Sequence, residues 1–260
     1  MRVAQAFVLL GAMLAWGAIG VTCPHGFAQG SKDDWAAALQ KELPPPFLRL
    51  VDEGSVQFVQ DDSILARAGK SALTIFRIDI RFKLQYRLQP QGADRYRVTM
   101  ALLNPSFRVQ HEMVLPSNLD LNSPFGKKLI AHEFDHVAIS SDPRLERLAA
   151  KVLWTSESWM VSNGTNGSLN DAQIQAECES KMQIRRKSIE DLVTQHYAML
   201  DRVSNQGLQD IDDRKEFFSG LYSEETLTQI SFEFLPKIRT LIKSSKFQET
   251  KSHYERLDAR

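Results

Sequence analysis

The sequence predicts an α+β fold, and two observations indicate it. Residues 76–115 alternate apolar and polar side chains, as strands do when one face of a sheet is buried and the other is wet. From residue 123 onward the apolar residues recur at helical spacing instead. Because the strand pattern precedes the helical pattern, we expect an antiparallel β-meander followed by helices, and not alternating βαβ units.

The meander is expected to lie between residues 55 and 115 and to have three or four strands. "SVQFVQ" at 55–60 is a candidate first strand. Further alternating runs, separated by "QPQGAD" and by a break at "NPS", follow at residues 76–88, 96–102 and 107–115. His111 falls on the apolar side of the last run, so we assign this histidine to the core and not to a site.

Two cap-and-proline pairs mark the starts of helices in the second half of the chain. Ser123 and Asp142 each precede a proline, the arrangement of an N-cap followed by Pro at the first helical position. The two helices carry "KKLIAHEFDHVAI" and "PRLERLAAKVLW". After a loop at "SNGTNGS", a long helix is expected from about Asn170 to Ser204, closing at Gly207. A final helical stretch, interrupted by a proline, follows.

The N-terminus has the pattern of a secretory signal. Arg2 precedes a long apolar run, and Gly26 and Ala28 occupy the small positions of a signal-peptidase site. We predict that residues 1–28 are removed and that the chain is exported, to the periplasm or the medium. The alternative is an uncleaved membrane anchor, because the apolar run is just long enough to span a bilayer.

The remaining chain divides into three parts by composition. Residues 29–54 are expected to form a lead-in segment, stiff at "ELPPPFLRL" (42–50), where three consecutive prolines argue against regular helix. Residues 55–207 carry the strand and helix patterns of the main domain. Residues 208–260 form a C-terminal helical segment with a polar tail.

Charge and cysteine content exclude several classes of protein. Without Arg2, 31 of the 32 Lys and Arg residues remain against 32 Asp and Glu, a net charge of −1. A near-neutral chain without a basic block gives no electrostatic basis for binding nucleic acid. No membrane-embedded segment is expected after signal cleavage. Cys178 is the one cysteine left in the mature chain, so an internal disulfide is excluded.

The chemistry of the chain is concentrated in "LIAHEFDHVAIS" at 129–140. His132 and His136 are four residues apart, so on a helix both imidazoles face the same side and can bind one ion. Zinc prefers nitrogen ligands in a tetrahedral array, and a catalytic site keeps one position for water. Glu133 lies beside the pair and can act as general base on that water. Ile130, Phe134 and Val137 form a different stripe, which can bury against the sheet.

The third metal ligand is less clear, and three residues are candidates. If the helices before and after "SNGTNGS" pack as an antiparallel hairpin, residues 132–136 lie opposite roughly residues 192–200, at about 1.5 Å per residue on both sides. His196 and Asp201 fall in or beside that window. Asp142 lies ten residues after His132, although an N-cap role suits an Asp before Pro better.

These motifs resemble those of a known group of enzymes. "HEFDH" resembles the signature of the zincin metallopeptidases, whose active-site helix packs under a sheet with the substrate along the edge strand. "LIAHEFDHVAI" followed by "YAMLDRVSNQG" at 197–207 is similar to a bacterial group of predicted secreted zinc proteases. In the second motif Ser204 stands where that group has Thr, and Gln206 where it has His. Asp135 is a charged residue between the two histidines, where the stricter pattern has uncharged ones.

The resemblance implies a zincin-like domain over residues 55–207 and also points to Asp201. We therefore rank Asp201 first, His196 second and Asp142 third as ligand. The expected function is an exported zinc-dependent peptidase that hydrolyses a peptide or protein substrate by metal-activated water. The alternative is a non-catalytic cell-envelope binding module in which the HExxH motif is vestigial or structural.

Overall fold

A computed structural model describes residues 3–5, 32–43, 45–52, 55–92, 94–162 and 171–250. Most of the predicted signal segment 1–28 and the last part of the polar tail lie outside these described residues. The described chain mixes helices with a sheet, as the α+β prediction states. Within this part of the chain, no helix is both long and apolar enough to cross a bilayer.

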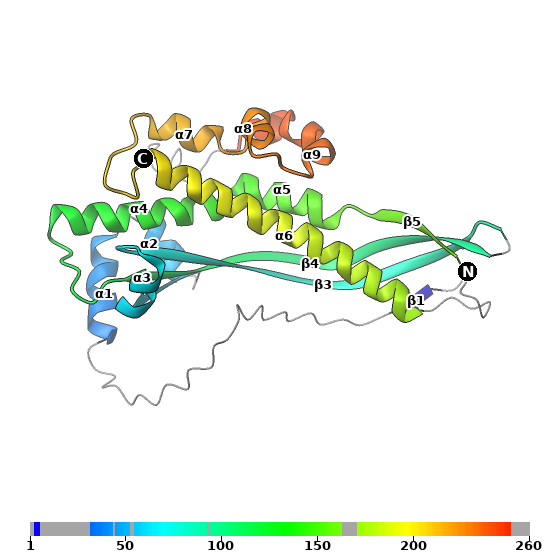
Figure 1. The fold of residues 1–260 in the computed structure, drawn as a ribbon, viewed down its shortest axis with the longest axis horizontal. Helices are drawn as coiled ribbons and strands as arrows, with labels where there is room; N and C mark the ends of the chain where they lie inside the picture. The colour runs from blue at the N-terminus through cyan, green and yellow to red at the C-terminus, as the bar shows by residue number, and fades with distance from the viewer. Residues whose placement is uncertain are drawn as a thin grey trace.

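Two very long strands form the centre of the sheet. β3 (Leu73–Pro90) and β4 (Arg95–Leu115) pair antiparallel along nearly their whole length and run through the elongated molecule (Figure 1). The predicted break at "NPS" is therefore wrong, since residues 96–115 belong to one strand. Asn104 instead has a left-handed φ of 49°, and the register shifts opposite it. A β-bulge absorbs the extra residue and tolerates the proline that follows.

The other strands flank this hairpin. The meander prediction is wrong for a second reason, because one of these strands pairs parallel to its neighbour. β2 (Val56–Gln60) forms where a first strand was predicted, but it pairs parallel to the end of β4. β5 (Glu157–Ser162) pairs antiparallel to the start of β4 and was not predicted. β1 (Val3–Gln5) pairs with β3 near the far end of the hairpin. The sheet is thus mixed, not a simple meander.

Helices precede the hairpin and follow it. Before it lie α1 (Lys32–Glu42), α2 (Pro45–Asp52) and α3 (Asp62–Ala68). After it come α4 (Pro124–Ser140), α5 (Pro143–Trp154), α6 (Asp171–Val203), α7 (Arg214–Gly220), α8 (Glu224–Gln229), α9 (Leu235–Ile242) and α10 (Ser245–Gln248). Ser123 and Asp142 cap α4 and α5 with their side chains, each followed by proline, as predicted. The prediction that the proline-rich lead-in has no regular helix is wrong, because α2 begins at Pro45. A proline is tolerated at the first helical position, since the N–H it lacks would have no partner within the helix.

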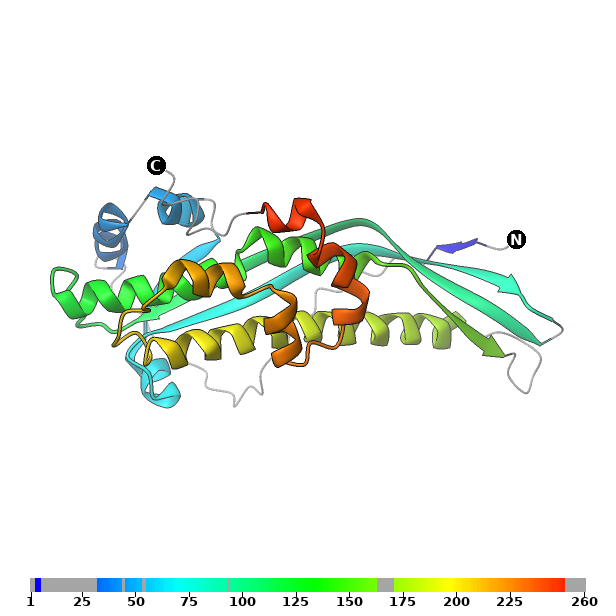
Figure 2. The ribbon, with the colours of Figure 1, turned by 90° about the horizontal axis from the view of Figure 1, so that it is seen from above.

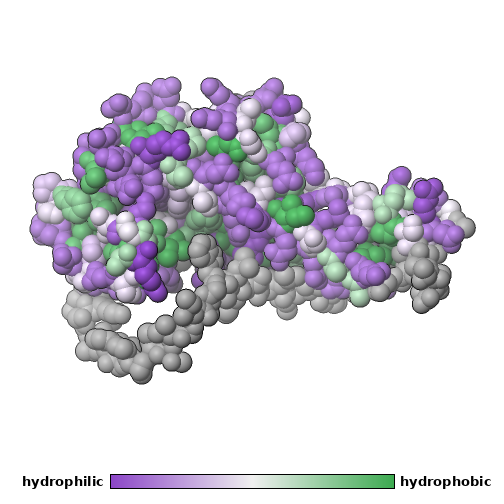
Figure 3. Space-filling view, in the orientation of Figure 1, coloured by the Kyte–Doolittle hydropathy of each residue, from purple (hydrophilic) through white to green (hydrophobic). Residues whose placement is uncertain are grey.

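The helices that follow the hairpin are stacked over one side of the sheet. α4 and α5 follow one another along the hairpin, α6 runs back alongside both, and α7 to α9 lie on top of them (Figures 1 and 2). The apolar face of β3 and β4, the inner faces of α5 and α6, and residues of the C-terminal segment as far as Phe247 share one core cluster. A second cluster joins α1, α2 and β2 to α4. The face drawn in Figure 3 is mostly hydrophilic, with hydrophobic side chains in small separate groups.

Candidate metal centre

α4 separates an apolar face from a polar one. Ile130, Phe134 and Val137 are buried in the second core cluster, as the sequence predicts. The ring of Phe134 packs 4.3 Å from that of Phe47 on α2. This packing fixes the rotation of α4 about its axis, and the opposite face then presents its two histidines and Glu133 to a pocket.

Three side chains from two helices converge in this pocket. The Nε2 atoms of His132 and His136 both lie 3.1 Å from Oδ1 of Asp201, which is on the last turns of α6. The two imidazole rings stand 4.7 Å apart, centroid to centroid. Ligand atoms about 2.0–2.1 Å from a tetrahedral metal lie about 3.3 Å from each other. The His132–His136–Asp201 cluster therefore has the atoms and spacing to hold a metal ion.

The other two candidates for the third ligand lie elsewhere. His196 is fully buried in the core, where its ring meets that of Tyr222 edge-on at 4.9 Å. Asp142 accepts a hydrogen bond from the Arg144 amide at the start of α5 and forms an ion pair with the Arg144 side chain. Neither belongs to the cluster, because His196 packs in the core and Asp142 caps α5.

Ser204 lies beside the Nδ1 nitrogen of His132, with its hydroxyl oxygen 3.4 Å away. The Ser204 hydroxyl donates to the Leu200 carbonyl at 2.8 Å and accepts from the Gly207 amide at 3.1 Å. It can also accept a hydrogen bond from His132 in the tautomer that carries its proton on Nδ1. The lone pair of Nε2 then points at the Asp201 carboxylate. Two electron-rich atoms at this distance repel unless a proton or a metal cation lies between them.

His136 is held differently from His132. Its Nδ1 is buried and has no hydrogen-bond partner among the described residues. The ring instead packs 4.3 Å from the ring of Tyr197, one turn before Asp201 on α6. Tyr197 donates to Ser140, Ser140 in turn bonds to Nε2 of His111 at 2.6 Å, and the Nδ1 of His111 bonds to the Ser55 carbonyl. This buried chain fixes the Tyr197 ring that supports His136, and His111 lies in the core as predicted.

Asp201 is the electrostatic centre of the site. Burial acts to raise the pKa of its carboxyl, but hydrogen bonds from His132, His136 and Lys70 outweigh burial and hold the pKa far below its usual range. Lys70 Nζ contacts Oδ2 of the carboxylate at 2.9 Å, while Oδ1 faces the histidines. The carboxylate is therefore ionised, as a metal ligand must be.

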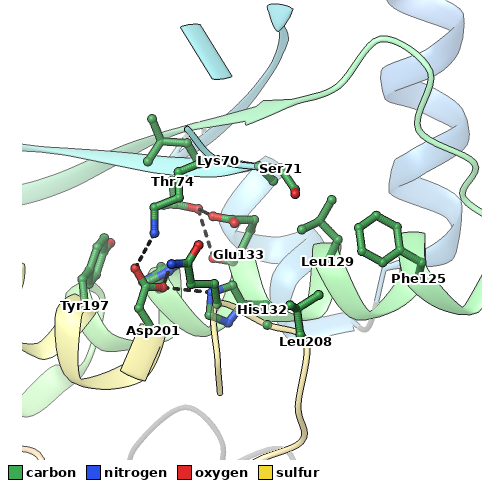
Figure 4. A pocket seen from close by; sticks show the side chains of 15 residues that line it. Lys70, Ser71, Thr74, Phe125, Leu129, His132, Glu133, Tyr197, Asp201 and Leu208 are labelled. Atoms are coloured by element: carbon green, nitrogen blue, oxygen red, sulfur yellow. Dashed lines mark hydrogen bonds and ion pairs between the residues drawn. The ribbon is translucent and has the colours of Figure 1, made fainter. Parts of the chain in front are cut away.

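Glu133 lies beside the cluster without joining it. Thr74, near the start of β3, donates a hydrogen bond to its Oε2 at 2.7 Å. Figure 4 shows this bond on one side of the pocket and the Lys70–Asp201 contact close to it. Glu133 lines the pocket of about 120 Å³ with the two histidines. Its carboxylate can thus exchange a proton with a molecule held at the cluster.

The Asp135 side chain does not line the pocket. Its buried carboxylate forms an ion pair with Arg214 on α7, and neither residue lines the pocket. Burial raises the pKa of the Asp135 carboxyl to about 7, against the opposing effect of the Arg214 guanidinium. Gln206, in contrast, does line the pocket.

Sequence reasoning missed several residues of the site. Tyr197 and Ser204 were given no role, although with the predicted Asp201 they follow the i, i+4, i+7 spacing of one helix face, a signal that was present in the sequence. Lys70 and Thr74 reach the site through tertiary structure, and no local pattern marks them. The chain matches no protein-family model, no curated protein and no solved structure. Conclusions about its function therefore rest on the geometry of this site.

Proposed function

We propose that the chain is a zinc-dependent peptidase, exported from the cytoplasm. The observation that carries the proposal is the convergence of His132, His136 and Asp201 with Glu133 beside them in one pocket. Two imidazole nitrogens and one carboxylate oxygen are the donor set of a catalytic zinc site, which leaves a fourth position for water. Zinc, when bound, acts as a Lewis acid that lowers the pKa of water and polarises a carbonyl group.

The protein residues have separate roles in this proposal. His132, His136 and Asp201 bind the ion, and Ser204 and Tyr197 orient the two imidazoles. Glu133 takes a proton from the attacking water at its carboxylate and passes that proton to the nitrogen of the leaving amine. The hydrogen bond from Thr74 holds Glu133 Oε2 in place during both transfers.

The position of β3 supports a peptide as the substrate. β3 begins at the pocket with Leu73 and Thr74. Along residues 73–84, β3 pairs with β4 alone among the described strands, so no described strand pairs with its second edge there. An extended peptide can add to such an edge through its main chain. Phe125, Leu129 and Leu208 line the pocket beyond His132 and offer an apolar surface to a substrate side chain (Figure 4).

The experiment that tests the proposal separates metal binding from catalysis. Protein purified without a histidine tag is analysed for metal content, and its cleavage of fluorescently labelled casein is followed. We expect about one zinc per chain in the native protein and in Glu133→Gln, but no turnover in Glu133→Gln, because the base is gone while the ligands remain. His136→Ala should lose both zinc and turnover.

Two results would contradict the proposal. Full cleavage by Glu133→Gln would remove Glu133 from the mechanism. A native protein that takes up no zinc, and whose melting temperature is unchanged by a chelator, would favour the non-catalytic binding module instead.

A further inference from the structure

The two oxygens of the Asp201 carboxylate have different partners. Oδ1 lies 3.1 Å from Nε2 of both His132 and His136, whereas Oδ2 lies 2.9 Å from Nζ of Lys70. Lys70 is 131 residues away in sequence and comes from the segment between α3 and β3. The Lys70 ammonium group thus contacts Oδ2 of the carboxylate, and Oδ1 remains facing the two histidines.

The backbone of Lys70 is fixed by the end of α3. Gly69 has a left-handed φ of 63° and caps the helix, and the Lys70 amide donates to the Leu65 carbonyl at 3.1 Å. β3 starts three residues after Lys70. Between a helix cap and a strand the Cα position has little freedom, so the side chain is directed into the pocket, where Figure 4 shows it pointing at Asp201.

The contact suits a role beyond simple charge pairing. The Lys70 and Asp201 side chains are 29% and 27% exposed, and an ion pair of such exposure contributes only about 0–1 kcal/mol to stability. A carboxylate can bind a metal through one oxygen or through both. If both oxygens of Asp201 bound zinc, together with two imidazoles and a water, the ion would have five ligands in place of the four of a tetrahedral catalytic site.

We propose that Lys70 is a positioning residue that makes Asp201 a one-oxygen ligand. It holds Oδ2 through its ammonium group, so that only Oδ1 is offered to the ion. This inference rests on the proposed zinc site. Lys70 lies on neither α4 nor α6, the helices that carry the three ligands. In this inference it determines how many ligand atoms the protein supplies to the ion.

The test compares Lys70→Met, which removes the charge at similar length, with Lys70→Arg, which keeps it. Lys187→Met is the matched control, because Lys187 also pairs with a carboxylate, Asp191, but on an exposed part of α6. Each protein is loaded with cobalt(II) in place of zinc, and its visible absorption spectrum is recorded. Four-coordinate cobalt absorbs more strongly than five-coordinate cobalt, so the spectrum reports the number of ligands without any turnover.

We expect the cobalt form of Lys70→Met to have clearly weaker visible bands than the native protein. We expect its zinc form to lose about 10-fold or more in kcat with little change in KM. A loss of this size is usual when a residue that orients a metal ligand is removed. Lys70→Arg should keep the native spectrum and most of the activity, and Lys187→Met should be unchanged in both. If Lys70→Met does not fold, Lys70→Gln replaces it in the same comparison.

The outcomes distinguish this inference from the proposed function. A native spectrum and native kcat in the charge-removing variant would overturn the role of Lys70 and leave the peptidase proposal standing. A native protein that binds neither cobalt nor zinc would overturn both. Loss of activity in Lys70→Arg to the level of Lys70→Met, with unchanged spectra in both, would also contradict the inference, since the charge would then have no effect on ligation.

Discussion

At the scale of single residues, Gly207 determines whether His132 can occupy its position. Its φ is +80°, and a Cβ built on it would lie 2.7 Å from Cγ of His132. The two preceding residues, Asn205 and Gln206, also have left-handed φ values. Strain of this kind persists where the surrounding structure requires it, often at functional sites. Here it ends α6 and turns the backbone against the imidazole.

We predict that Gly207→Ala displaces His132 and lowers zinc affinity at least 10-fold, with a loss of roughly 1–3 kcal/mol in the free energy of unfolding. Chelator competition and urea denaturation measure the two effects. Gly92→Ala is the control, because Gly92 also has a positive φ but no atom within 4 Å of the added Cβ. Equal zinc affinity in the two variants would show that the contact with His132 has no consequence.

At the scale of elements, Arg185 joins α6 to the end of α5. It lies in the charged run "QIRRKSIED", in which Arg186 and Lys187 pair with acids one turn later. Arg185 instead is 2% exposed and donates to the carbonyls of Leu153 and Thr155, where α5 has ended. It also pairs with Glu157 at the start of β5. One guanidinium thus satisfies the carbonyls at a helix end.

Arg185→Met is predicted to lower the free energy of unfolding by about 3 kcal/mol, because it leaves the carbonyls of Leu153 and Thr155 without their donor and removes one of the two cations paired with Glu157. Arg186→Met, on the next position of the same helix, should cost about 1 kcal/mol or less. Urea denaturation of both variants gives the comparison. Similar losses would mean that the burial of Arg185 does not matter to stability.

At the scale of the whole molecule, the C-terminal segment belongs to the main core. Arg144 of α5 donates to the carbonyls of Phe218 and Ser219, and the Tyr222 hydroxyl donates to the Ile139 carbonyl of α4. His196 lies in this shared core. Burial is the main cause that lowers the pKa of His196 to about 3, and the charge of Arg144 lowers it further.

This histidine should make the stability of the whole fold depend on pH. In the unfolded chain His196 binds a proton below about pH 6.5, whereas in the folded chain it stays neutral down to about pH 3. As the pH falls through that window, the proton favours the unfolded state, and His196 lowers the free energy of unfolding by up to about 1.4 kcal/mol per pH unit. Metal-free His196→Leu should show a shallower fall than the metal-free native protein. Parallel curves would contradict this prediction.

The sequence by itself determined that helices follow the long strands from about residue 123 on, the caps of α4 and α5, and the placement of His132 and His136 on one helix face. These features depend on local periodicity and on residues within one turn, which a sequence pattern records. The sequence also narrowed the expected third ligand to three residues. The register of antiparallel helices indicated His196 and Asp201, and the spacing from His132 indicated Asp142.

Only the tertiary structure decided among those three residues, and it overturned the predicted break in β4 and the purely antiparallel sheet. The residues "NPS" are compatible with a turn and with a β-bulge, so the sequence did not distinguish the two. The direction in which β2 pairs depends on its contacts with β4, which is distant in sequence. Lys70 and Thr74 meet Asp201 and Glu133 only because α3, β3, α4 and α6 pack together. Contacts between segments so far apart arise from the burial of whole elements, which no single stretch of sequence encodes.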